Sequence, residues 1–167
     1  MLTYHPAMTD GKPASQSHVE LTELVMPGDA NVLGTAFGGK IMQWTDLAAS
    51  LAAMRHCRLP VVTASIDQLS FLSPVRIGHI AIFTAQVNAV FATSMEVGVE
   101  VVTEDPGSGA RRKCCDAYLT FVALGTDGKP TAVPPLVTAA EAERRRVREA
   151  HRRRESRLAL RATLKGG

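Results

Sequence analysis

Long apolar runs and cysteine are both scarce in this sequence. No uncharged apolar stretch reaches about 18 residues, so we expect no helix that spans a membrane. The three cysteines, Cys57, Cys114 and Cys115, cannot all pair, and the adjacent two could bridge each other only under strain. The N-terminal sequence MLTYHPAMTDGKPASQ also lacks the basic and apolar blocks of an export or transit signal. These absences predict a cytoplasmic protein.

The usual catalytic and cofactor signatures are absent as well. The sequence contains no GxGxxG, GxxxxGK, GxSxG, HExxH or CxxC pattern. Nucleotide hydrolysis, α/β-hydrolase chemistry and zinc binding therefore have no support from motifs. We expect a protein that needs no metal and no resident cofactor.

Basic charge is concentrated at the C-terminal end. Residues 1–140 contain nine Lys and Arg against twelve Asp and Glu, whereas residues 141–167 contain ten basic and four acidic residues. This segment has no interleaved aromatic residues and no DNA-binding motif, so we expect no nucleic-acid partner. We interpret residues 138–167 as an Arg-rich solvated helix, because it has little apolar stripe; phosphate binding or a partner helix are the alternatives.

The rest of the chain predicts a single domain built around one helix. Residues 1–17 are polar and carry prolines, which suits a flexible leader, and residues 18–137 form the domain. The run from 40 to 55 has no proline or glycine and predicts a long helix. Because the loops are too short for βαβ crossovers except across this helix, we predict an α+β fold with an antiparallel sheet curled around it. Period-two patterns place the strands at residues 18–26, 61–71, 79–92, 94–104 and 112–124.

Asp46 is an unusual residue within the predicted helix. It lies off the apolar stripe, and its neighbours on the helical wheel include Ala49 and Ala53 rather than the Lys and Glu of a solvated face. The carboxylate is therefore expected in a confined place, where it either takes part in chemistry or only accepts a structural hydrogen bond. The stripe itself consists of Ile41, Trp44, Leu47, Ala48, Leu51 and Ala52.

Other residues before and within the helix are candidates for a site. Gly38 and Gly39 stand where a loop enters the helix, so a ligand could approach their backbone N–H groups, which suit an oxyanion or a polarised carbonyl. Paired glycines also commonly do no more than ease a tight turn. His56 and Cys57 point about 100° apart on the helix, which favours packing over an acid-base dyad. Cys114 and Cys115 alternate on a strand, which predicts one buried and one exposed thiol.

The segment MPGDANVLGTAFGGKIMQWTD resembles the signature of the hotdog-fold acyl-CoA thioesterases, in the group of small bacterial acyl-CoA hydrolases and cytosolic long-chain acyl-CoA hydrolases. The similarity extends over roughly residues 20–160 and includes RHCRLPVVTASIDQLSFLSPVRIG and YLTFVALGTDGKPTAVPPLV. It implies a hotdog fold, dimers with a continuous sheet that assemble further into a hexamer as a trimer of dimers, and active sites at the dimer interface. Asn31 would come from one subunit and Asp46 from the other, with small residues beside Asp46 leaving room for the substrate.

The activity that the resemblance implies is hydrolysis of fatty acyl-CoA to fatty acid and coenzyme A. Asp46 would act as general base for water or as nucleophile, Asn31 would position water or the thioester, and Gly38 and Gly39 would hold the carbonyl oxygen. A non-catalytic acyl-CoA sensor and a dehydratase of the same architecture are the rivals. Further candidates for contact with the substrate or its coenzyme A phosphates are Phe71, Ser73, Arg76, Ser94, Arg111, Arg112 and Lys113.

Overall fold

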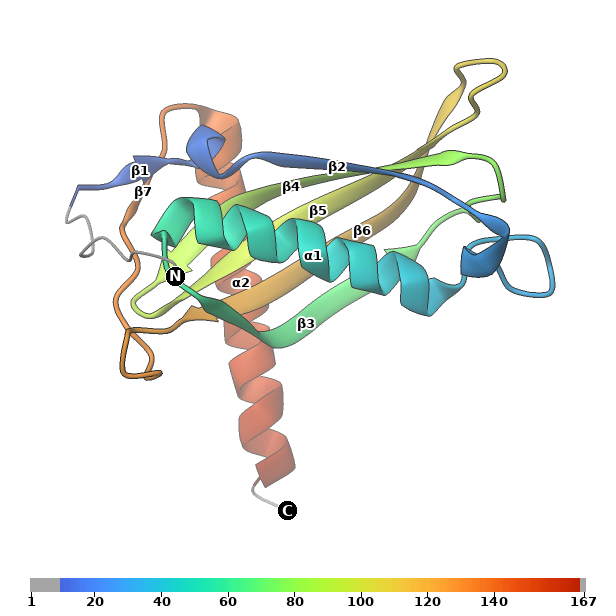
Figure 1. The fold of residues 1–167 in the computed structure, drawn as a ribbon. Helices are drawn as coiled ribbons and strands as arrows, with labels where there is room; N and C mark the ends of the chain where they lie inside the picture. The colour runs from blue at the N-terminus through green and yellow to red at the C-terminus, as the bar shows by residue number, and fades with distance from the viewer. Residues whose placement is uncertain (1–9, 166–167) are drawn as a thin grey trace.

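A computed structural model describes residues 10–165 and has the predicted architecture. One five-stranded antiparallel sheet has the order β2-β4-β5-β6-β3, and the long helix α1 lies across one of its faces (Figure 1). Because β2 and β3 are the two edges, α1 connects one edge to the other over that face. The elements of the sheet and helices are β2 (Val19–Leu24), α1 (Gly38–Cys57), β3 (Val61–Phe71), β4 (Ile80–Phe91), β5 (Ser94–Glu104), β6 (Arg111–Ala123) and α2 (Glu141–Lys165).

Alanines bring α1 close to the sheet. Four of them, Ala48, Ala49, Ala52 and Ala53, are fully buried, and Trp44 packs edge-on against Phe83 of β4 at 5.9 Å between ring centroids. The predicted helix is confirmed, but its predicted stripe is partly wrong, since Leu47 is 45% exposed and Leu51 is 36% exposed. The small side chains face the protein's own sheet because they allow close packing, and two leucines of the stripe face outward instead. Ala49 and Ala53 therefore belong to the core of this chain.

A bulge in β6 corrects the prediction for the two adjacent cysteines. Val101 of β5 pairs with Cys115 and Val102 pairs with Lys113, so Cys114 is an extra residue in the ladder. The extra residue breaks the alternation of side chains across the sheet. Both thiols are consequently buried, at 1% and 0% exposure, and neither is on the surface.

Residues 12–17, expected to belong to a flexible leader, pack against the domain; residues 1–9 lie outside the described residues. The short strand β1 (Lys12–Pro13) pairs in parallel with β7 (Leu136–Val137), and the 3-10 turn η1 (Ala14–Ser17) follows it. The Lys12 ammonium donates a hydrogen bond to the His56 carbonyl at 2.8 Å. This N-terminal segment thus fastens the end of α1 to the segment that follows the sheet.

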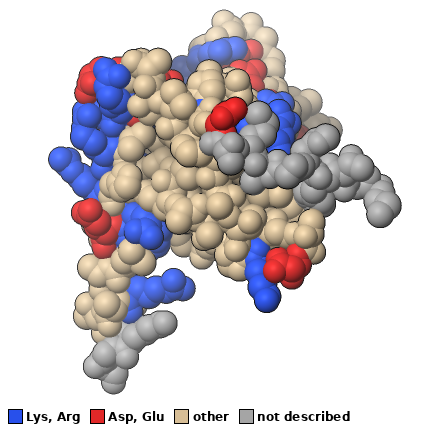
Figure 2. Space-filling view, turned by 90° about the vertical axis from the view of Figure 1, so that its left-hand side faces the viewer, with Lys and Arg blue, Asp and Glu red and all other residues tan. Residues whose placement is uncertain are grey.

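The C-terminal helix α2 lies on the face of the sheet opposite α1 (Figure 1), so its interpretation as a merely solvated helix is wrong. Ala150 is fully buried against Ala89 and Phe91. Arg153 makes two hydrogen bonds to Glu96, at 2.6 and 3.1 Å, and Glu96 is only 1% exposed. Arginines thus dock the helix, while its remaining basic side chains follow α2 down the left of Figure 2.

We expect Arg153→Met to lower the free energy of unfolding by roughly 3 kcal/mol, because it leaves the buried Glu96 carboxylate without its cation. The measurement is the urea midpoint, followed by circular dichroism. Arg152→Met is the matched control, because Arg152 is an exposed arginine on the same helix and should change stability by less than about 0.5 kcal/mol. Equal midpoints for the two variants would show that the ion pair does not hold α2.

Candidate active site

The loop between β2 and α1 is held by hydrogen bonds among its own residues. It begins with a 3-10 turn, η2 (Pro27–Asp29), and the Asp29 carboxylate accepts a hydrogen bond from the Met26 N–H at 3.0 Å. That hydrogen bond, helped by Lys40 at 3.2 Å, lowers the pKa of Asp29. The Phe37 N–H donates to the Asp29 carbonyl at 2.8 Å. The loop is thereby fixed to the first turn of α1.

Asn31 closes this loop with its side-chain oxygen. Asn31 Oδ1 accepts hydrogen bonds from the Leu33 N–H at 2.9 Å and from the Thr35 hydroxyl at 3.2 Å. Gly34 completes the turn with a φ of 71°, a conformation that glycine adopts without strain. Within residues 10–165, no acceptor contacts the Asn31 amide nitrogen. Its two N–H donors are therefore available to a ligand.

Gly38 and Gly39 are the first two residues of α1, so their N–H groups have no partner within the helix. Among residues 10–165, neither N–H donates to a backbone carbonyl of the preceding loop. A Cβ added at Gly39 would lie 3.1 Å from the Phe37 ring, so glycine lets this ring pack closely over the helix start. Two free donors at the positive end of the helix dipole suit an oxygen that gains negative charge.

Asp46 is held by a residue that sequence reasoning did not select. The Thr63 hydroxyl, on β3, donates a hydrogen bond to Asp46 Oδ1 at 2.7 Å. Among the described residues no other group contacts the carboxylate, so Oδ2 is free to accept a proton. Threonine is common in strands, and nothing in the run VVTASIDQLSF distinguishes Thr63 from its neighbours. Its partner on the helix is visible only once the sheet is assembled.

One chain does not bring the predicted catalytic groups together. Gly38 and Asp46 are eight positions apart on one straight helix, which separates them by about 12 Å along its axis. A base and an oxyanion donor that act on one carbonyl must both lie within about 3 Å of the reacting atoms. If Asp46 and the glycines act on the same carbonyl, they must therefore come from different copies of the chain.

The surface around Asp46 has the character of an interface. β3 is an edge strand of 11 residues, and edge strands with unpaired backbone groups are normally covered. Several large apolar side chains on α1 and β3 are also exposed, and exposed apolar patches mark contact sites. The exposed large apolar residues on α1 and β3 are Met42, Leu47, Leu51, Met54, Val62, Ile66 and Phe71.

The coenzyme A candidates fall into different environments. Arg111 pairs with Glu104 at 2.6 Å, and Lys113 pairs with both Glu100 and Asp116, which raises the pKa of Lys113. Their charges are thus largely satisfied within the chain.

Arg76 and Arg112 contact no carboxylate among residues 10–165 and are free to meet a phosphate. Phe71 and Ser73 line a cavity beside Gly38, near the start of β6. Ser94 lies apart from them, in a second cavity beneath α2, where its hydroxyl donates to the Phe91 carbonyl.

His56 and Cys57 are packing residues, as their spacing predicts. Both are buried; His56 Nε2 lies 2.9 Å from the Pro134 carbonyl and the Cys57 thiol donates to the Leu59 carbonyl. Burial lowers the pKa of His56. No cluster of three or more His, Cys, Asp or Glu with metal-binding geometry occurs in residues 10–165. Across the same residues, none of the helices has the length and apolar character that a membrane span needs.

Comparison with known proteins places this geometry in a family. A model of the thioesterase superfamily matches residues 33–110. An uncharacterized acyl-CoA thioester hydrolase of Bacillus subtilis (strain 168), YkhA, is 42% identical over 128 residues, which cover 77% of this chain and 74% of that protein. The chain belongs to the hotdog-fold acyl-CoA thioesterases. Mouse acyl-coenzyme A thioesterase 11 is 37% identical over 87% of the chain, but the chain spans only 25% of its length.

Solved thioesterase structures share the whole fold. An apo-hexameric acyl-CoA thioesterase superposes with a TM-score of 0.88 at 38% identity, covering 92% of this chain and 98% of that one. An acyl-CoA hydrolase from Staphylococcus aureus, in complex with butyryl coenzyme A, coenzyme A and coenzyme A disulfide, superposes with a TM-score of 0.86 at 36% identity, covering 93% and 94%. The curled sheet, α1 and α2 of this thioesterase are thus the shared scaffold.

Proposed function

We propose that this protein hydrolyses fatty acyl-CoA to the free fatty acid and coenzyme A, in the cytoplasm and without a metal ion or resident cofactor. The observation that carries the proposal is the pair of free N–H groups at Gly38 and Gly39, together with a carboxylate at Asp46 whose Oδ2 is free. The similarity to thioester hydrolases and to a structure with bound butyryl coenzyme A supports the substrate class.

The reaction proceeds by activation of water. Asp46 Oδ2 takes a proton from a water molecule while the Thr63 hydroxyl holds the other carboxylate oxygen in place. The water oxygen attacks the thioester carbon, and the carbonyl oxygen gains negative charge against the N–H of Gly38. The Asn31 amide donates to the water or to the thioester. Collapse of the intermediate breaks the C–S bond, and the departing coenzyme A sulfur takes up the proton that Asp46 took from water.

The active unit is a dimer in which each site combines Asn31, Gly38 and Gly39 of one chain with Asp46 and Thr63 of the other. Pairing of two β3 edges would cover the exposed apolar residues and continue the sheet from one subunit to the next. Further assembly to a hexamer, as a trimer of dimers, is in line with the hexameric structural relative. Free Arg76 and Arg112 are the candidates to meet the coenzyme A phosphates.

Thiol release measured over a series of acyl-CoA chain lengths tests the activity directly. Turnover of at least one member supports hydrolysis. Binding of acyl-CoA to the dimer with no turnover of any chain length would instead favour a non-catalytic acyl-CoA sensor.

Subunit sharing predicts that two inactive variants restore one another. When Asn31→Ala and Asp46→Asn chains are co-refolded, each mixed dimer contains one intact pair and one doubly defective pair. Random pairing makes about half the dimers mixed, so roughly a quarter of wild-type thiol release per chain should return. Each variant refolded alone is the control. If subunits exchange freely, as size-tagged chains can show, and no activity returns, each site lies within a single chain.

A further inference from the structure

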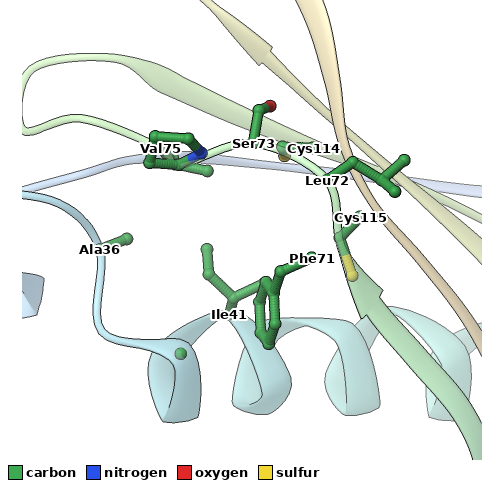
Figure 3. A pocket seen from close by; sticks show the side chains of 10 residues that line it. Ala36, Ile41, Phe71, Leu72, Ser73, Val75, Cys114 and Cys115 are labelled. Atoms are coloured by element: carbon green, nitrogen blue, oxygen red, sulfur yellow. The ribbon is translucent and has the colours of Figure 1, made fainter.

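A cavity of about 360 Å³ opens between the start of α1, the end of β3 and the bulge of β6. Gly38 lines the cavity, so the residue whose N–H is proposed to hold the thioester carbonyl borders it. Figure 3 shows the Ile41 and Phe71 side chains on its α1 side and the Cys115 sulfur directed toward them. A chain attached to a carbonyl at Gly38 has this cavity directly beside it.

We propose that this cavity holds the acyl chain of the substrate and that the Cys115 side chain limits how long a chain fits. This inference rests on the proposed hydrolysis, which by itself does not say where the acyl chain lies.

The chemistry of the cavity wall suits an alkyl chain. Among the residues that the structure describes, no charged side chain lines it and the one hydroxyl, at Ser73, already donates to the Lys113 carbonyl at 3.0 Å. Two backbone N–H groups of lining residues are taken as well: Leu72 donates to Cys114 and Ala36 donates to Val75. The pantetheine arm of coenzyme A carries two amides, which would lose their hydrogen bonds with water here and find few replacements. The alkyl chain has no such groups to satisfy.

The two cysteines form an uncharged part of this wall. Burial raises the pKa of Cys114 to about 12 and that of Cys115 to about 11, so both remain thiols at neutral pH. A protonated, buried cysteine behaves as a small apolar side chain. The β6 bulge brings both of them to the cavity, whereas regular alternation would have turned one away.

The volume sets an expected limit on chain length. If a methylene group takes about the volume of a water molecule, roughly 30 Å³, the cavity accommodates about a dozen carbons. Each buried methylene should raise kcat/KM about fourfold until the cavity is full. We therefore expect kcat/KM to rise up to acyl chains of about ten to twelve carbons and to level off or fall beyond them.

The test compares Cys115→Met, Cys115→Ala and the wild-type protein with butyryl-, octanoyl-, dodecanoyl- and hexadecanoyl-CoA. Methionine adds two heavy atoms, about the bulk of two methylenes, so the ratio of kcat/KM for dodecanoyl-CoA to that for butyryl-CoA should fall at least about tenfold. Alanine removes the sulfur and should move the limit to longer chains. Cys57→Met is the matched control, because Cys57 is buried at the far end of α1 outside the cavity, and its ratio should stay within about twofold of wild type.

Binding measured by calorimetry in the Asp46→Asn background separates this inference from the proposed activity. The Kd for acyl-CoA should fall as the acyl chain lengthens, up to the same limit. Cys115→Met should move that limit to shorter chains, and this result does not depend on whether any variant hydrolyses acyl-CoA. Equal chain-length profiles for wild type and a folded Cys115→Met protein would overturn the proposal. The proposal would also be overturned if Cys115→Met weakened the binding of free coenzyme A as much as the binding of dodecanoyl-CoA. The pantetheine arm would then occupy the cavity. If Cys115→Met does not fold, an unchanged limit in Cys115→Ala overturns it.

Discussion

Asp46→Asn is expected to lower thiol release from acyl-CoA by about 10²- to 10⁴-fold, the usual range for loss of a general base. Asparagine keeps the size of the side chain and can still accept the hydrogen bond from Thr63, but it cannot take the proton from water. KM should change little, because the substrate contacts proposed at Gly38 and in the cavity beside it do not involve this carboxylate.

The matched control is Asp127→Asn, which makes the same chemical change in an exposed turn, where Asp127 accepts a hydrogen bond from the Lys129 N–H. Its activity should equal that of the wild-type protein. Light scattering and thermal unfolding are the checks that the Asp46→Asn protein is still folded and oligomeric. A folded variant that keeps turnover within about tenfold of wild type would leave Asp46 only as a structural acceptor for Thr63.

Much of the fold could be predicted from the sequence because each local pattern agrees with the final structure. The stretch without proline or glycine became α1, and the five alternating segments became the five strands of the main sheet. The position of the helix stripe was harder to predict. A helical wheel favours Leu47 and Leu51 for the buried side because they are the larger apolar residues, yet close packing against a sheet favours alanine. Hydrophobicity alone does not separate the buried face of the helix from its exposed face.

Two further differences arise from contacts distant in sequence. The alternation of residues along β6 could not predict that Cys114 and Cys115 are both buried. The extra residue of a β-bulge cannot be recognised from the composition of a strand. The charge pattern of α2 suggested solvation because the carboxylate that pairs with Arg153 lies 57 residues earlier, on β5. A buried Glu96 within the apolar run MEVGV was a signal that some cation would reach it.

The candidate site residues and their division between two subunits are both predictions of the resemblance. Asn31, Gly38, Gly39 and Asp46 come from the motif itself. Helix geometry supports their division between subunits, because about 12 Å of α1 separates Gly38 from Asp46 within one chain. Thr63 needed the structure, since its role depends on how β3 passes α1.

Gly38→Pro is expected to lower kcat by about 10²- to 10³-fold, the usual loss when one oxyanion donor is removed. Proline at this position deletes the N–H and leaves the helix intact, because Gly38 is the first helical residue, where proline is well tolerated. The preceding residue, Phe37, already has the extended conformation that proline requires before it, with φ −64° and ψ 132°. A side chain is also sterically acceptable, since a Cβ on Gly38 would meet only the Phe71 ring, at 3.6 Å.

Gly38→Ala is the control that isolates the N–H group, because alanine adds the same Cβ contact with Phe71 but keeps the donor. We expect it to retain kcat within about tenfold of wild type, with any change in KM shared by both variants. Stopped-flow thiol release under saturating acyl-CoA separates kcat from KM, and the unfolding midpoint checks that the helix start is intact. If Gly38→Pro and Gly38→Ala lose the same amount of activity, the Cβ rather than the missing N–H is responsible. The carbonyl oxygen would then have to be held elsewhere, and Gly39 would be the next donor to test.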